Sequence, residues 1–107
     1  MIRETIMTNK AWQERVKGSS NDGKGYCMIE AMSKKGDEKF INFYAVPTHM
    51  KEDVLSNNAL LMKSADVKNM YKVNLEKYNN DIEGHCKKAE DVFSSYVSYQ
   101  NKSATSR

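Results

Sequence analysis

The sequence contains few cysteines, few prolines and no long apolar run, and each scarcity excludes a class of protein. Among 107 residues there are one proline and two cysteines, Cys27 and Cys86. So few cysteines cannot form a disulfide scaffold, and without an export signal we expect both thiols to be reduced. Nowhere do about 18 apolar residues follow one another, and residues 1–7 lack the apolar core of a signal peptide. We therefore expect a cytoplasmic protein without a membrane span.

An excess of charge of one sign is also missing. The formal net charge is only +3, and no segment forms a basic tail. Lysine outnumbers arginine by 14 to 3, and asparagine, tyrosine and methionine are common, which is the composition that A/T-rich codons give. This composition favours an A/T-rich genome as the source, either that of a phage or that of a low-GC bacterium.

The length of the chain allows one modest hydrophobic core. We find no internal repeat and no linker, so we expect a single domain over residues 1–107. Residues 101–107 offer nothing to bury and are expected to form a frayed tail.

The strongest periodic pattern lies in the last third of the chain. Apolar and aromatic residues recur there at steps of four and three, a spacing typical of a helix. The members of this repeat are Tyr71, Leu75, Tyr78, Ile82, His85, Ala89, Val92, Tyr96 and Tyr99. We therefore expect a helical segment over residues 65–100. It is either one helix or two helices with a hinge at Asn79–Asn80, where Asn80 and Glu83 have the form of a capping box.

The two alternatives for this segment predict different oligomeric states. One continuous helix would be about 50 Å long, which exceeds any core that the other residues could form. Its overhanging end would expose Phe93, Tyr96 and Tyr99. In that case we expect a homodimer formed through the C-terminal helix. The folded-back alternative predicts a monomer.

The earlier part of the chain predicts a short helix and then a β-hairpin. Thr8 to Gly18 has the capping residues and the spacing of a short helix, with Trp12 in the core. From Tyr26 to Val46 the period changes to two, and two runs rich in strand-forming residues flank a turn sequence. We expect a hairpin with Lys35–Gly36 at its tip.

The two faces of this hairpin differ in composition. The face expected to lie on the core is wholly apolar and consists of Cys27, Ile29, Ala31, Ile41, Phe43 and Ala45. The other face carries Tyr26, Met28, Glu30, Met32, Phe40, Asn42, Tyr44 and Val46. This second face is too apolar to be simply solvated, so it predicts a contact surface.

The segment after the hairpin is short and mixed. Pro47 ends the second strand, and Thr48 opens a helical turn or two that stops near Asn57–Asn58. Residues 59–63 are too few to distinguish a third strand from a helical turn. The expected fold class is α+β, in which a short N-terminal helix and an antiparallel hairpin, with or without a third strand, pack on a long or folded-back C-terminal helical segment.

Motifs for nucleotide or RNA recognition are incomplete. Gly18, Gly23 and Lys24 have the spacing of a P-loop, but Gly25 stands where Ser or Thr must bind magnesium. The run Lys24-Gly25-Tyr26 resembles part of the RNP1 signature of RNA-recognition motifs, although the chain does not show that family's βαββαβ order. A Tyr beside a basic loop is all that remains of this resemblance, and a hairpin whose outer face is covered by a helix is the favoured alternative.

Motifs for metal binding and catalysis are also incomplete. Cys27, His49, His85 and Cys86 lack the spacing of a zinc site, because neighbouring residues of a helix point about 100° apart. His49 has acidic residues nearby but no nucleophile that the sequence places against it. We expect no cofactor, no metal and no enzymatic activity.

By elimination, the sequence predicts a small protein-binding module, and a phage or mobile-element inhibitor of a host protein is one concrete version. The expected contact residues are Tyr26, Met28, Phe40, Tyr44, Tyr96 and Tyr99. The alternative is a nucleic-acid-binding accessory protein that uses the basic loop side of the hairpin. The residues expected to contact nucleic acid are Lys24, Lys34 and Lys35.

Overall fold

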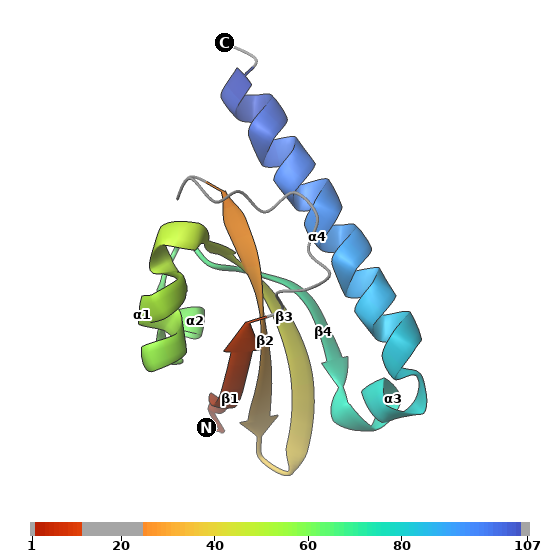
Figure 1. Ribbon diagram of the computed structural model, residues 1–107. Helices are drawn as coiled ribbons and strands as arrows, with labels where there is room; N and C mark the ends of the chain where they lie inside the picture. Colours follow the sequence, from red (N-terminus) through yellow and green to blue (C-terminus); the bar gives the residue numbers. More distant parts are fainter. Residues whose placement is uncertain (1, 12–24, 106–107) are drawn as a thin grey trace.

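A four-stranded antiparallel sheet forms the centre of the molecule, and helices cover both of its faces (Figure 1). The computed structural model describes residues 2–11 and 25–105. The strands are β1 (Glu4–Ala11), β2 (Tyr26–Lys35), β3 (Glu38–Pro47) and β4 (Lys68–Asn74), and they lie in the sheet in chain order. The helices are η1 (Thr48–Met50), α1 (Lys51–Ser56), α2 (Leu60–Lys63), α3 (Leu75–Asn80) and α4 (Ile82–Thr105).

The predicted β-hairpin is present as β2 and β3, but its tip lies one residue later than expected. Lys35 pairs with Glu38, so Gly36 and Asp37 form a two-residue turn. Gly36 has a φ of 62°, the left-handed conformation that a type II′ turn needs at its first central position. This turn fixes the register of the whole hairpin.

The register corrects the predicted faces. Ile29 lies opposite Tyr44, and Met28 lies opposite Ala45. Because side chains alternate along a strand, a change of one residue in register exchanges the faces of one strand relative to the other. Each predicted face therefore combined β2 residues from one face of the sheet with β3 residues from the other face. Both faces are in fact buried, so neither is the open contact surface that the sequence suggested.

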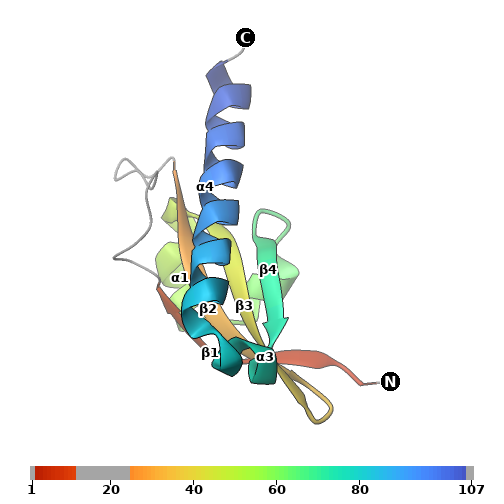
Figure 2. The same ribbon diagram turned by 90° about the vertical axis from the view of Figure 1, so that its right-hand side faces the viewer.

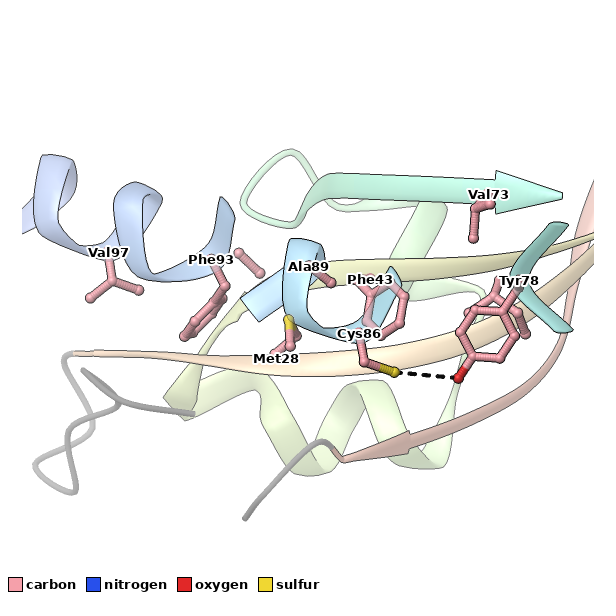
Figure 3. Close-up of a cluster of buried hydrophobic side chains, with 10 residues drawn as sticks. Met28, Phe43, Val73, Tyr78, Cys86, Ala89, Phe93 and Val97 are labelled. Atoms are coloured by element: carbon pink, nitrogen blue, oxygen red, sulfur yellow. Dashed lines mark hydrogen bonds between the residues drawn. The ribbon is translucent and has the colours of Figure 1, made fainter. Parts of the chain in front are cut away.

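Helix α4 covers the first face of the sheet (Figures 1 and 2). It contributes Cys86, Ala89, Phe93 and Val97, at steps of three and four, which is the stripe that a helix turns towards a core. Figure 3 shows these side chains meeting residues of the sheet and Tyr78 of α3. The whole cluster consists of Met28, Ile41, Phe43, Ala45, Val73, Tyr78, Cys86, Ala89, Phe93 and Val97.

Helices α1 and α2 cover the second face. Val54 of α1 and Leu61 of α2 are almost fully buried against the sheet. The sheet residues in this cluster are Ile29, Ala31, Tyr44 and Val46. The helical turns predicted after Thr48 are therefore confirmed, and residues 60–63 are helical rather than a third strand.

The predicted N-terminal helix is wrong where the structure describes it. Residues from Thr8 to Ala11 belong to β1, which pairs with β2. Thr8 was predicted to cap a helix. It lies in a strand instead, because this strand pairs with the backbone N–H and C=O groups on the outer side of β2. Trp12 and Gly18, the other residues of that prediction, lie outside the described residues.

The predicted helical segment over residues 65–100 is also wrong in its first part. Residues 68–74 form β4, whose side chains Tyr71 and Val73 face α4. Their spacing to Leu75 and Tyr78 imitates a helical repeat, but it crosses a junction between a strand and a helix. Pairing with the buried strand β3 outweighs local helix propensity here. The fold remains α+β in the broad sense.

The helical conformation is interrupted between α3 and α4, close to the predicted hinge. Helix α3 ends at Asn80, and α4 begins at Ile82. Asp81 caps α4, because its Oδ1 accepts a hydrogen bond from the Gly84 N–H at 3.1 Å. The predicted capping box at Asn80 and Glu83 was therefore placed one residue too early. Within the described residues, no helix has the length and apolar character needed to cross a membrane.

Candidate functional site

A row of aromatic and apolar side chains runs along one side of α4 and includes one residue each of β2 and β4. We call this row the aromatic edge. Its members are Tyr26, Tyr71, His85, Val92, Tyr96 and Tyr99. The four residues from α4 lie next to the buried stripe of that helix, so they reach the margin of the core rather than its centre. The aromatic edge is therefore partly covered by the sheet and partly open.

At one end of the aromatic edge, Tyr71 of β4 meets His85 of α4. The Tyr71 hydroxyl lies 2.5 Å from His85 Nδ1, and the two rings are stacked with centroids 6.0 Å apart. Burial raises the pKa of Tyr71, and the negative charge of Asp81 raises it further. The Tyr71 hydroxyl therefore keeps its proton at neutral pH. Lys88 lies over the Tyr71 ring, with its Nζ 5.6 Å from the centroid.

At the other end, Tyr26 of β2 meets Tyr96 of α4. Their rings pack edge to face, with centroids 5.4 Å apart and an angle of 77° between the planes. Lys68 of β4 places its Nζ 5.4 Å from the centroid of Tyr96. Burial raises the pKa of Tyr96, and the neighbouring Tyr26 adds to this effect. The Tyr96 hydroxyl therefore stays neutral at physiological pH.

Beyond Tyr96 the aromatic edge becomes exposed. Val92 is 36% exposed and Tyr99 is 66% exposed, the highest value among the exposed large apolar residues of the described chain. Figures 1 and 2 show that the C-terminal part of α4 projects past the end of the sheet. Tyr99 lies in the C-terminal third of α4, and the described residues leave most of its side chain uncovered.

The structure separates the six contact residues that the sequence predicted. Tyr26, Tyr96 and Tyr99 are brought to the aromatic edge. Met28 is fully buried beneath α4, and Tyr44 is 4% exposed on the opposite face of the sheet, where burial raises its pKa to about 12. Neither of these two can be reached by a partner in this fold. Phe40 is half-buried, with Lys72 Nζ 4.5 Å from the centre of its ring.

The structure describes two of the three residues predicted to contact nucleic acid. Lys34 and Lys35 are exposed at the end of β2, and Lys24 lies outside the described residues. Glu4 and Glu38 pair in register with Lys35, whereas Lys34 pairs with Thr5 and Lys39. Sequence reasoning overlooked Lys68 and Lys88, whose positions over tyrosine rings depend on the packing of α4 against β4.

A polar network crosses the second face of the sheet from β1 to β4. Glu4 accepts hydrogen bonds from Ser33 Oγ and Lys72 Nζ, both at 2.6 Å. Asn42 donates to Ser33 Oγ at 2.8 Å and accepts from Asn69 Nδ2 at 3.0 Å. Ser33 and Asn42 are fully buried, and their polar groups are partnered. The network therefore satisfies buried polar groups and has no open position for a ligand.

The thiols and possible metal ligands are dispersed. In the described part of the chain, no group of three or more His, Cys, Asp or Glu residues could hold a metal ion. Cys27 and Cys86 are not bonded to each other. Burial raises the pKa of the Cys27 thiol, so it is a poor nucleophile. Cys86 is buried in the core, with its sulfur 3.6 Å from the Tyr78 hydroxyl (Figure 3).

No protein-family model, no curated protein and no solved structure matches the chain. The function must therefore be argued from the geometry of the aromatic edge.

Proposed function

We propose that this protein is a non-enzymatic protein-binding module and that the aromatic edge of α4 is its contact surface. The supporting observation is the exposure of Tyr99 and Val92 on a helix that projects beyond the sheet, next to the packed pair Tyr26 and Tyr96. Aromatic residues of this kind commonly supply most of the energy of an interface. Tyr99 follows Tyr96 by three residues on α4, so the packed pair and the exposed ring lie on the same side of the helix.

The first partner to test is a second copy of the chain. Two α4 helices that packed along their aromatic edges would cover Tyr99 and Val92 of both copies in a symmetric interface. We expect the mass measured by sedimentation equilibrium to rise with concentration in the micromolar range. Tyr99→Ala and Val92→Ser should each weaken this association, because each removes exposed apolar area without disturbing the core.

Met62→Ala provides a matched control for these variants. Met62 is 47% exposed but lies on α2, which covers the other face of the sheet. This variant should associate like the parent protein. A mass that stays monomeric over the whole range would exclude the homodimer. In that case, a photo-crosslinking residue placed at position 99 should capture a different protein in the source cell, whereas the same residue at position 62 should not. If position 99 captures no protein, the proposal fails.

A second candidate function is the binding of single-stranded nucleic acid at the same surface. Lys68 and Lys88 lie over the rings of Tyr96 and Tyr71, and lysines interleaved with aromatic rings are typical of proteins that bind single strands. Binding of this kind would weaken steeply with added salt, because counterions are released. Fluorescence anisotropy with a labelled oligonucleotide tests it. Lys68→Gln and Lys88→Gln should lower affinity, whereas loss with Lys34→Gln and Lys35→Gln would point to the hairpin instead.

A further inference from the structure

A hollow opens between β1 and β2, at the side of the sheet away from β4. Its volume is about 270 Å³, which is the size of a small organic fragment rather than of a peptide. Its lining consists of Thr8, Asn9, Lys10, Glu30, Met32 and Ile41. Met32 and Ile41 form an apolar wall, because both also pack against the core cluster under α4. Thr8 supplies a neutral hydroxyl, whereas the Asn9 side chain donates to Val54 O of α1.

The carboxylate of Glu30 lines this hollow, and one of its oxygens lacks a partner. Oε1 is buried and makes no hydrogen bond with any of the described residues. The Glu30 side chain is only 11% exposed, and burial raises the pKa of its carboxyl, although the charge of Lys10 opposes this. A carboxylate that is removed from water is destabilised unless donors surround it, and Glu30 has only the distant Lys10 beside it. Because Oε1 has almost no accessible surface, a donor in the hollow would meet the carboxylate at Oε2.

Lys10 is a poor internal donor for this carboxylate. Its Nζ lies 3.9 Å from Glu30 Oε2, which is beyond hydrogen-bonding distance, and its side chain is 68% exposed. An exposed lysine gains little from such a pair, because water competes for its charge and its long side chain loses conformational freedom. Lys10 can therefore be displaced by a better donor that approaches Glu30 from the hollow.

We infer that the hollow between β1 and β2 binds a small ligand that carries an amidinium or guanidinium group on an apolar body. The N–H groups of such a cation would bind the Glu30 carboxylate at Oε2, the oxygen beside Lys10. The apolar body would lie against Met32 and Ile41. This site is separate from the aromatic edge, because none of its lining residues belongs to that surface.

Benzamidine is a suitable probe, since it combines an amidinium group with one aromatic ring. We expect saturable shifts in the NMR signals of the Met32 and Ile41 methyl groups, with a dissociation constant on the order of 1 mM, as is usual for a ligand of this size. Benzyl alcohol, which has the ring without the charge, should give no saturable shift. Glu30→Gln keeps the shape of the side chain but should weaken benzamidine binding about tenfold or more.

Lys10→Met provides an independent test that does not depend on the folding of the Glu30 variant. It removes the competing cation from an exposed position, so benzamidine should bind about threefold more tightly than to the parent protein. The inference is overturned if the parent shows no saturable shift, if benzyl alcohol binds equally well, if Glu30→Gln binds like the parent, or if Lys10→Met leaves the affinity unchanged. Tighter binding in Lys10→Met together with loss in Glu30→Gln would support it.

Discussion

Glu4 lies at the start of the first strand, yet its carboxylate reaches over the sheet to the last one. Its two oxygens accept hydrogen bonds from Lys72 and Ser33. Burial alone would raise the pKa of this carboxyl, but the hydrogen bonds from Lys72 and Ser33 and the charges of Lys72 and Lys35 outweigh that effect and lower it. The folded protein therefore holds the Glu4 carboxylate more strongly than the unfolded chain does.

This lowered pKa predicts how stability depends on pH. Glu4 contributes stability above its unfolded pKa of 4.5, and this contribution is lost as the pH falls through the lower pKa of the folded state. Glu4→Gln should lower the free energy of unfolding by about 1 kcal/mol at neutral pH, a modest value because Lys72 is partly exposed. Near pH 3 the variant should differ less from the parent protein.

Urea unfolding at neutral pH and at about pH 3 measures this difference. Glu38→Gln, at an exposed position beside the hairpin turn, is the control and should change stability little at either pH. Glu30 has the opposite effect, because its pKa is raised and the free energy of unfolding falls as the pH rises through that pKa. Each variant must therefore be compared with the parent protein at the same pH. A Glu4→Gln deficit that stayed constant down to pH 3 would contradict the prediction.

At the scale of the element, the start of α4 depends on two residues that act together. Asp81 caps the helix through the Gly84 N–H, and a Cβ added at Gly84 would collide with the Asp81 carboxylate. Alanine is ordinarily about 1 kcal/mol better than glycine inside a helix, but here it would displace a cap that contributes about the same amount. Gly84→Ala should therefore change the stability of the parent protein little.

The same substitution should behave differently once the cap is removed. In an Asp81→Ala background, Gly84→Ala has no carboxylate to displace and should stabilise the protein by about 1 kcal/mol. Urea unfolding of the parent, the two single variants and the double variant gives the coupling between the two residues. Effects that simply add would show that Asp81 and Gly84 act independently.

Local patterns predicted some elements well and others poorly. The strands β2 and β3 and helix α1 were predicted because alternation, a glycine turn and Pro47 all indicate the same boundaries. Strand β4 was missed because Tyr71 continues, by spacing, a repeat that belongs to α3 and α4. Strand β1 was missed because its stability comes from pairing with β2, a long-range interaction that its own sequence does not reveal.

The same limit applies to the sites. Tyr26, Tyr96 and Tyr99 could be selected from the sequence as contact residues, but their position on one surface depends on where α4 crosses the sheet. Met28 and Tyr44 were misassigned because the prediction left one face of the hairpin open, whereas α4 covers one face and α1 and α2 cover the other. The hollow beside Glu30 could not be predicted at all, since half of its lining comes from β1.

At the scale of the whole molecule, both edges of the described sheet are interrupted. In β1 the register shifts between Ile6 and Thr8, so Met7 is an extra residue, and in β4 the shift beside Tyr71 leaves Met70 extra. Such bulges twist an edge strand and disfavour the addition of another strand. Addition of a strand from another molecule is therefore disfavoured at both edges, which agrees with the proposed contact surface on α4.

The polar network from Glu4 to Lys72 also has a consequence for folding kinetics. Neighbouring strands of the sheet follow one another in the chain, so each pairing can form with a modest loop closure. The pair between Glu4 and Lys72 joins residues 68 positions apart and requires the last strand to be in place. The network should therefore form after the main barrier to folding has been crossed.

Asn69→Ala tests this order of events, because Asn69 belongs to β4 and donates to Asn42. A loss of about 1 kcal/mol should appear as an unfolding rate about fivefold higher, with the folding rate unchanged. Gly36→Ala, in the hairpin turn, is the comparison and should slow folding if the hairpin forms early. A slower folding rate for Asn69→Ala would show that β4 docks before the barrier. With an unchanged folding rate, the network sets how long a molecule stays folded, and hence how often its chain opens to a protease.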